Sequence, residues 1–126
     1  MHIRLASGLD LEPLSHLLNQ YRSQLGQEKD YQACRRFLIS RLSENDSIIF
    51  VAVNHDSLIG FIQLYPSYSS IFLKPVWHLE DTYVIDEYKD DNIAQQMLLK
   101  AKQLADGTEV ILINSNEPQQ DELVAS

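Results

Sequence analysis

The sequence has little of what marks secreted, membrane-spanning or nucleic-acid-binding proteins. Its 126 residues include a single cysteine, Cys34, which cannot form a disulfide within the chain and therefore favours a reducing, cytoplasmic location. The first residues lack the apolar core of a signal peptide, and no apolar run approaches the length that spans a membrane. Ten basic side chains stand against eighteen acidic ones, and the net charge of −8 argues against nucleic-acid binding, which depends on neutralising phosphates.

Metal-binding motifs are also absent, because histidine and cysteine do not recur at ligand spacing. Neither H-x-x-x-H nor C-x-x-C occurs, so we expect no metal site. The excess of acidic side chains has two interpretations. It attracts a cationic substrate such as an amine, or it is the ordinary acidity of many soluble proteins.

What the sequence contains is typical of one globular domain covering residues 1–126. Hydrophobic residues make up 44% of the chain and charged residues 22%, which is close to the average of folded proteins. No linker, internal repeat or low-complexity tract divides it. A chain of this length can bury a sizeable core.

Two helices are predicted in the first third of the chain. A short strand at residues 3–6 precedes a helix that Asp10 caps and whose apolar residues recur at three- and four-residue spacing. Pro13 fits the first helical turn, which does not need the missing N–H, and Gly26 ends the helix. The second helix carries one apolar stripe, made of Tyr31, Cys34, Phe37, Leu38 and Leu42.

The rest of the chain predicts four strands and one more helix. Residues 47–53 are apolar on both faces, as in a central strand, and the turn residues at 54–57 predict a hairpin. The remaining predicted elements are strands at 58–65, 76–85 and 109–113, a long polar and aromatic loop at 66–75, and a helix at 91–105 that Gly107 ends. A hairpin implies antiparallel pairing and strand–helix–strand implies parallel pairing, so the expected class is α/β (α+β) with a mixed sheet.

Six segments in this order resemble motifs of the GNAT superfamily of N-acetyltransferases. The segment Leu79-Glu80-Asp81-Thr82-Tyr83-Val84 resembles the family's fourth strand, L-E-D-L-Y-V, and residues 86–89 (D-E-Y-K) resemble the P-E-Y-R that follows it. Residues 89–94 (K-D-D-N-I-A) align with the pyrophosphate loop R/Q-x-x-G-x-G/A. The others are 60–61 (G-F), 63–67 (Q-L-Y-P-S) and 116–118 (N-E-P).

This resemblance implies a GNAT-like fold that lacks the family's last two strands, since the sequence stops at Ser126. It implies an acetyl-CoA-dependent N-acetyltransferase that acts on a primary amine, either a small amine, a polyamine or a lysine-like side chain. By the same resemblance the cofactor-binding residues are Thr82, Tyr83, Val84, Lys89, Asn92, Ile93, Ala94, Gln95 and Asn116.

The pyrophosphate loop departs from the family pattern at Asn92, which stands where glycine is expected. Asparagine adopts positive φ more readily than most other residues, so the turn is impaired and not abolished. Two carboxylates, Asp90 and Asp91, would repel a pyrophosphate, or they point to solvent and cap the helix. These departures from the family's loop pattern also support an alternative, a catalytically inactive GNAT-derived module for binding or dimerisation.

The resemblance implies that Glu80 is the base that removes the amine's proton, often through water. The competing interpretation is that Glu80 is a solvated carboxylate on the strand. Because side chains alternate along a strand, Glu80 and Asp81 are expected on opposite faces, with Asp81 supporting the local structure. The candidates for the substrate site are Tyr21, Tyr65 and Trp77, because aromatic rings hold cations, although such residues are also common in cores.

Two features beyond Glu109 bear on activity and assembly. The family's general-acid tyrosine falls on Leu123 here, so we expect slow turnover if the protein is an enzyme. The last strand, near Val110, would form an unpaired sheet edge, which predicts a homodimer that covers it.

Overall fold

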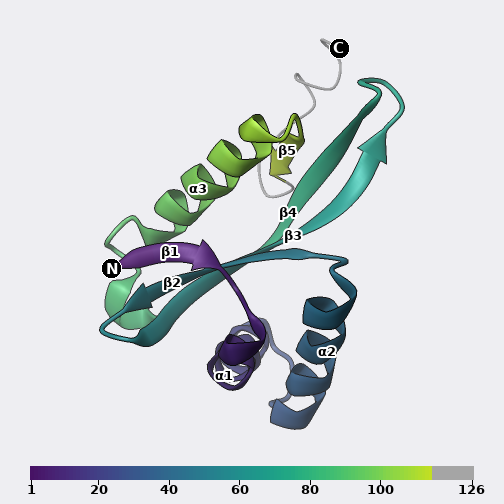
Figure 1. Ribbon diagram of the computed structural model, residues 1–126. Coiled ribbons are helices and arrows are strands. Elements are labelled where there is room, and N and C mark those ends of the chain that lie inside the picture. Colours follow the sequence, from purple (N-terminus) through teal and green to yellow (C-terminus); the bar gives the residue numbers. More distant parts are fainter. Residues whose placement is uncertain (115–126) are drawn as a thin grey trace.

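Residues 1–114, the part of the chain that the computed structural model describes, form a five-stranded mixed sheet with helices on both faces (Figure 1). The strands are β1 (His2–Leu5), β2 (Ile48–Asn54), β3 (Ser57–Ser69), β4 (Lys74–Val84) and β5 (Ile111–Asn114). The helices are α1 (Leu11–Gln24), α2 (Tyr31–Glu44) and α3 (Ile93–Gly107), with 3-10 turns η1 (Gly8–Asp10) and η2 (Asp86–Tyr88). The predicted order of elements is confirmed.

The strand order in the sheet is β1-β2-β3-β4-β5, so each strand pairs with its neighbour in the sequence. Pairing is antiparallel from β1 to β4 and parallel between β4 and β5, where α3 makes the crossover. The sheet is therefore mixed, as the hairpin and the strand–helix–strand pattern predicted.

Two hydrophobic cores lie on opposite faces of the sheet. Under α1 and α2 the core includes Leu14, Leu38 and Phe61, and under α3 it includes Ile62 and Met97. Five consecutive residues of β2 are buried, which explains why that strand is apolar on both faces. In Figure 1, α1 and α2 lie below the sheet and α3 lies above it.

The signals that begin and end the first helix act largely as predicted. Pro13 lies in the first turn of α1, and Gly26, just beyond the end of the helix, has a φ of 91°. Asp10 occupies the cap position, but its side chain makes no bond to α1. Its carboxylate instead accepts hydrogen bonds from the guanidinium of Arg4 at 2.8 and 2.9 Å and from the Ser7 amide at 2.8 Å.

The prediction of a long loop at residues 66–75 is wrong, because β3 and β4 extend through most of that segment as a hairpin. Only residues 70–73 lie between the two strands, and Pro66 pairs with Trp77. Strand β2 pairs with β3 only as far as Leu64, so from residue 65 onward one edge of β3 pairs with no strand of residues 1–114. Proline is tolerated at such an edge because no N–H is needed there. Figure 1 shows this hairpin rising past the rest of the sheet.

Gly60 lies in a tight contact between neighbouring strands and α3, and we predict that Gly60→Ala destabilises the protein. A Cβ atom at this position would lie 2.8 Å from the Tyr83 carbonyl oxygen and 3.4 Å from the Met97 Cε. The carbonyl belongs to the backbone and cannot move freely, so we expect a loss of about 1–3 kcal/mol in the free energy of unfolding. Urea denaturation of the two proteins measures it.

The matched control is Gly8→Ala, because a Cβ at Gly8 would have no neighbour within 4 Å. This variant should unfold at nearly the wild-type urea concentration. Equal midpoints for the Gly60→Ala and Gly8→Ala proteins would contradict the tight contact.

Candidate active site

A β-bulge interrupts β4 at the segment that carries the two candidate carboxylates. Gln63 of β3 pairs with Asp81 and the next residue, Leu64, pairs with Leu79, so Glu80 is the extra residue. Leu79 packs in the core under α3, whereas Asp81 accepts a hydrogen bond from the Tyr21 hydroxyl of α1 at 3.1 Å. Strict alternation would place residues 79 and 81 on the same face. The alternation used to assign faces to Glu80 and Asp81 therefore does not hold here.

Beyond the bulge, β4 leaves one edge open. Strand β5 pairs with β4 only from Val76 to Leu79, and no other strand among residues 1–114 pairs with that edge. The Ile85 N–H donates to the Ile59 carbonyl at 2.9 Å. Because bonded and non-bonded pairs alternate in an antiparallel ladder, the main chain of Tyr83 bonds to β3. The main-chain groups of Thr82 and Val84 consequently point toward the open edge.

The side chain of Tyr83 has a structural role. Its ring is buried against the rings of Tyr21 and Phe61, and its hydroxyl donates to the Gln20 side-chain oxygen at 3.2 Å. Burial raises the pKa of this hydroxyl. Three residues of β4 were predicted to bind the cofactor. The main-chain groups of Thr82 and Val84 are thus not bonded to β3, whereas the side chain of Tyr83 helps to hold α1 on the sheet.

The first turn of α3 leaves three backbone amides without an acceptor inside the helix. Asn92 adopts the left-handed conformation expected of it, with a φ of 60°, and the helix begins at Ile93. The Gln96 N–H donates to the Asn92 carbonyl at 3.0 Å, and the Asn92 side chain makes no capping bond. The amides of Ile93, Ala94 and Gln95 precede this first bond, so the helix itself supplies no carbonyl for them. Together with the helix dipole, these amides favour an anion.

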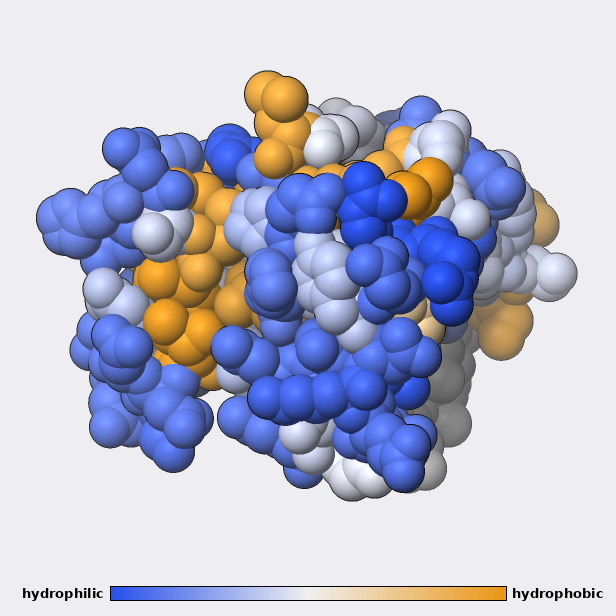
Figure 2. Space-filling model, turned by 90° about the horizontal axis from the view of Figure 1, so that it is seen from below, coloured by the Kyte–Doolittle hydropathy of each residue, from blue (hydrophilic) through white to orange (hydrophobic). Residues whose placement is uncertain are grey.

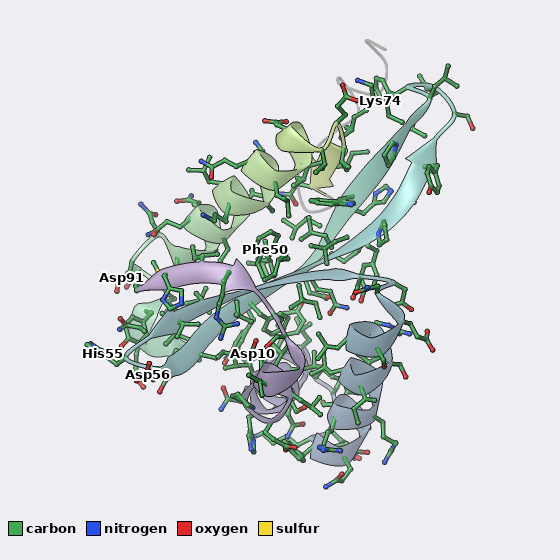
Figure 3. All side chains as sticks on the ribbon, in the orientation of Figure 1. Asp10, Phe50, His55, Asp56, Lys74 and Asp91 are labelled. Carbon is green, nitrogen blue, oxygen red and sulfur yellow. The ribbon has the colours of Figure 1, made fainter. Side chains whose placement is uncertain are left out.

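Charged side chains surround this helix end. Asp90 and Asp91 are exposed and precede the cap residue, and the Lys89 ammonium lies 4.0 Å from an Asp86 carboxylate oxygen. The Ile93 side chain is buried in the core under α3, so it is not available to a ligand. Figure 3 shows Asp91 at the same end of the molecule as the β2–β3 turn. Asn116, the remaining predicted cofactor residue, lies outside the described residues.

A pocket of about 400 Å³ lies between α1, α2 and the sheet, and it brings Tyr21, Tyr65 and Asp81 together. Phe37, predicted on the buried stripe of α2, is 39% exposed and also lines this pocket. The other lining residues are Leu18, Arg22, Leu25, Ala33, Cys34 and Gln63. In Figure 2, which shows the molecule from below, apolar side chains also gather in a hollow framed by hydrophilic residues at the left of the view.

Trp77 does not join this pocket. It packs against the core under α3 and lines a different hollow, together with Leu5 and Arg41. The structure thus brings together two of the three predicted aromatic residues.

The pocket shifts the titration of its polar groups. Burial raises the pKa of Asp81, the hydrogen bond from Tyr21 opposes this shift, and the charge of Glu80 adds to it. Burial, and then the charge of Asp81, raises the pKa of Tyr21 to about 12; burial raises that of Tyr65 to about 12 as well. Both phenols therefore stay neutral at physiological pH, whereas Asp81 titrates closer to neutrality than a solvated aspartate.

The structure places Asp81 at the candidate site, which the sequence did not predict. Glu80 is exposed, but its charge raises the pKa values of Asp81, Tyr21 and Tyr65, so it lies within electrostatic range of the pocket. Asp81 itself lines the pocket. The β-bulge at Glu80 places Asp81 in the pocket, and no residue type in this segment predicts a bulge.

Neither a metal centre nor a membrane segment is found in the described part of the chain. Residues 1–114 contain no group of three or more histidine, cysteine, aspartate or glutamate side chains placed to hold a metal ion. None of the described helices is long and apolar enough to cross a bilayer.

Comparisons with known proteins identify the family of the chain. The sequence model of the Acetyltransferase (GNAT) family matches residues 11–121. The uncharacterized N-acetyltransferase YhfO of Bacillus subtilis is 35% identical over 105 residues, which cover 83% of this chain and 70% of that protein. A probable acetyltransferase of Haemophilus influenzae is 33% identical over 94 residues, which cover 74% of this chain and 64% of that protein.

Solved structures give the same result for the fold. The crystal structure of a probable acetyltransferase superposes with a TM-score of 0.86 at 37% identity, covering 96% of this chain and 85% of that one. A predicted acetyltransferase from Clostridium acetobutylicum, solved with acetyl-CoA, superposes with a TM-score of 0.73 at 14% identity, covering 90% and 79%. The second likeness concerns the fold alone.

Proposed function

The chain belongs to the acetyltransferase (GNAT) family, and from that premise we propose that it transfers the acetyl group of acetyl-CoA to a small primary amine. The observation that carries this proposal is the position of residues 80–84 of β4. Their main chain borders the open sheet edge, and the Asp81 side chain lines the pocket under α1 and α2. A donor along the edge and an acceptor in the pocket would meet at this one segment.

The proposed donor site combines the open edge with the N-terminus of α3. The main chain of Thr82 and Val84, next to Tyr83, would pair with the pantetheine arm. The amides of Ile93, Ala94 and Gln95, which follow the turn at Asn92 and have no helical acceptor, would bind the pyrophosphate, with Lys89 adding a positive charge. The presence of acetyl-CoA in the related fold from Clostridium acetobutylicum supports this assignment.

The proposed chemistry is direct attack by the amine nitrogen on the thioester carbonyl. An alkylammonium has a pKa near 10.4, so it must first lose a proton, and Glu80 would take it directly or through water. A main-chain N–H at the open edge would stabilise the negative charge that develops on the carbonyl oxygen. The new N–C bond forms, the C–S bond then breaks, and the nitrogen loses its second proton to water while the leaving thiolate takes up a proton from water.

One observation favours the alternative, an inactive binding module of the same family. Asp90 and Asp91 are exposed beside the amides that would hold the pyrophosphate. At the dielectric of an exposed site, each repulsion costs on the order of 1 kcal/mol. A measurement of acetyl-CoA binding decides between the two.

We expect acetyl-CoA at millimolar concentration to raise the melting temperature of the wild-type protein. A ligand that binds only the native state stabilises it by about 2.7 kcal/mol at a hundredfold excess over Kd. Asn92→Val should abolish the increase, because a β-branched residue is strained at a φ of 60° and would displace the amides of α3. Differential scanning fluorimetry with and without acetyl-CoA measures both proteins.

Asn45→Val is the matched control for this experiment. Asn45 follows α2 in the same left-handed conformation, with a φ of 53°, so its replacement imposes similar strain away from α3. This variant should melt at a lower temperature but keep the increase with acetyl-CoA. If wild type shows no increase at all, the inactive module becomes the better description.

A cytoplasmic location and a homodimer belong to the same proposal. The outer edge of β5 pairs with no other strand of residues 1–114, and a second copy of the chain would cover it. A sedimentation mass equal to one chain would contradict the dimer.

A further inference from the structure

We propose that the amine acceptor is a small molecule that also carries a carboxylate, held with its ammonium toward Asp81 and its carboxylate toward Arg22. This inference rests on the proposed function, because it takes the pocket between α1, α2 and the sheet as the acceptor site. It narrows the acceptor to amino-acid-like amines and disfavours polyamines.

Two of the residues that line the pocket carry opposite charges. They are Asp81, a half-buried aspartate of the sheet, and Arg22 of α1. Leu18, Tyr21, Arg22 and Leu25 line it at spacings of three and four residues, so they share one face of α1. The Tyr21 hydroxyl donates to Asp81 at 3.1 Å, which orients the carboxylate from the same helix that carries Arg22.

Arg22 differs from the arginines that are bound to carboxylates. Arg4, Arg35 and Arg41 each form an ion pair at 2.6 to 2.9 Å. None of the ion pairs within residues 1–114 includes Arg22, whose Nη1 donates a long hydrogen bond of 3.4 Å to the Glu28 carbonyl. A guanidinium is well suited to a carboxylate, because two parallel N–H groups can bind its two oxygens.

The same arrangement works against a polyamine. A second ammonium in the pocket would approach the guanidinium of Arg22 and meet a like charge, whereas a carboxylate would be attracted. The net charge of −8 draws cations to the whole molecule, but the charge next to the bound group decides which molecule stays. A volume of about 400 Å³ lies at the low end for ligand sites and suits a molecule of this size.

Lysine and cadaverine provide a matched pair of acceptors, because they differ only in the carboxylate. We expect wild-type protein with saturating acetyl-CoA to acetylate lysine with a kcat/KM at least tenfold higher than cadaverine. Arg22→Met should remove this preference, since methionine retains the apolar stem and loses the charge. Arg36→Met, which removes an exposed arginine of α2, should leave it unchanged.

Calorimetric titration of the amines without acetyl-CoA separates this inference from the proposed function. Lysine binding to wild type that is lost in Arg22→Met would support the ligand class, even if no acetyl group is transferred. Equal or better use of cadaverine by wild type would overturn the inference while leaving the acetyltransferase activity in place. Equal lysine binding by wild type and Arg22→Met would overturn it too.

Discussion

Replacing Asp10 with alanine should lower the free energy of unfolding by about 2–3 kcal/mol. The Asp10 side chain is only 5% exposed and forms a two-bond ion pair with Arg4, which fixes β1 to the start of α1. Removing one partner of a buried pair leaves the other charge without compensation and typically costs 3–5 kcal/mol. Because Arg4 is 41% exposed, water screens part of that loss. Urea denaturation at pH 7 measures the difference.

The pH dependence of this difference has a defined sign. The hydrogen bond and charge of Arg4 hold the pKa of Asp10 below its usual value, so the folded state favours the carboxylate. Its contribution to stability is therefore present above the unfolded pKa of about 3.9 and is lost as the pH falls through the folded pKa. The difference in free energy of unfolding between wild type and Asp10→Ala should begin to shrink near pH 4 and should continue to shrink as the pH falls further.

Glu12→Ala is the control for Asp10→Ala. Glu12 also pairs with an arginine, Arg35, but the carboxylate is 58% exposed, and exposed pairs contribute little to stability because water and salt screen them. Equal losses in the two variants would show that burial of Asp10 adds nothing.

Glu80→Gln should reduce turnover by about 10²–10⁴-fold, the usual contribution of a general base. The amide keeps the size of the side chain but cannot accept the ammonium proton. The affinity for acetyl-CoA should not change, because the proposed donor site uses main-chain groups of β4 and α3. Release of free thiol at saturating acetyl-CoA measures turnover, and the increase in melting temperature reports on binding.

Two further variants make this experiment decisive. Glu87→Gln removes an exposed carboxylate of η2 and should leave turnover unchanged. Asp81→Asn tests the neighbouring carboxylate, whose raised pKa brings it closer to the value that suits a base at neutral pH. If Glu80→Gln turns over at the wild-type rate and Asp81→Asn lowers kcat without a matching rise in the KM of the amine, the base is Asp81.

The sequence predicted the features that depend on local periodicity and backbone preference. Apolar residues at helical spacing located the three helices of residues 1–114, and a continuous apolar run located β2. Asn92 was expected to adopt positive φ, and it does so at the first step into α3. These properties belong to short segments, so a single sequence contains them.

The features that the sequence did not predict depend on pairing between distant segments. Residues 66–75 contain prolines and polar residues typical of a loop, yet they form a hairpin because β2 ends opposite Leu64 and frees the edge of β3. The bulge at Glu80 arises from the register between β3 and β4, which no residue in β4 specifies alone. Trp77 was placed with Tyr65 by residue type, but the sheet separates the two residues.

The order of the strands bears on how the chain folds. Since every strand of the sheet pairs with its neighbour in the sequence, each can add to an edge that already exists, and none must enter between two strands that have already paired. The β2–β3 hairpin needs only the two-residue turn at His55 and Asp56, so its loop closes at little cost in entropy. The longer closures join β1 to β2 and β4 to β5, and both enclose helices that shorten the distance to be spanned. Such a topology keeps the relative contact order low for a sheet protein and favours rapid folding.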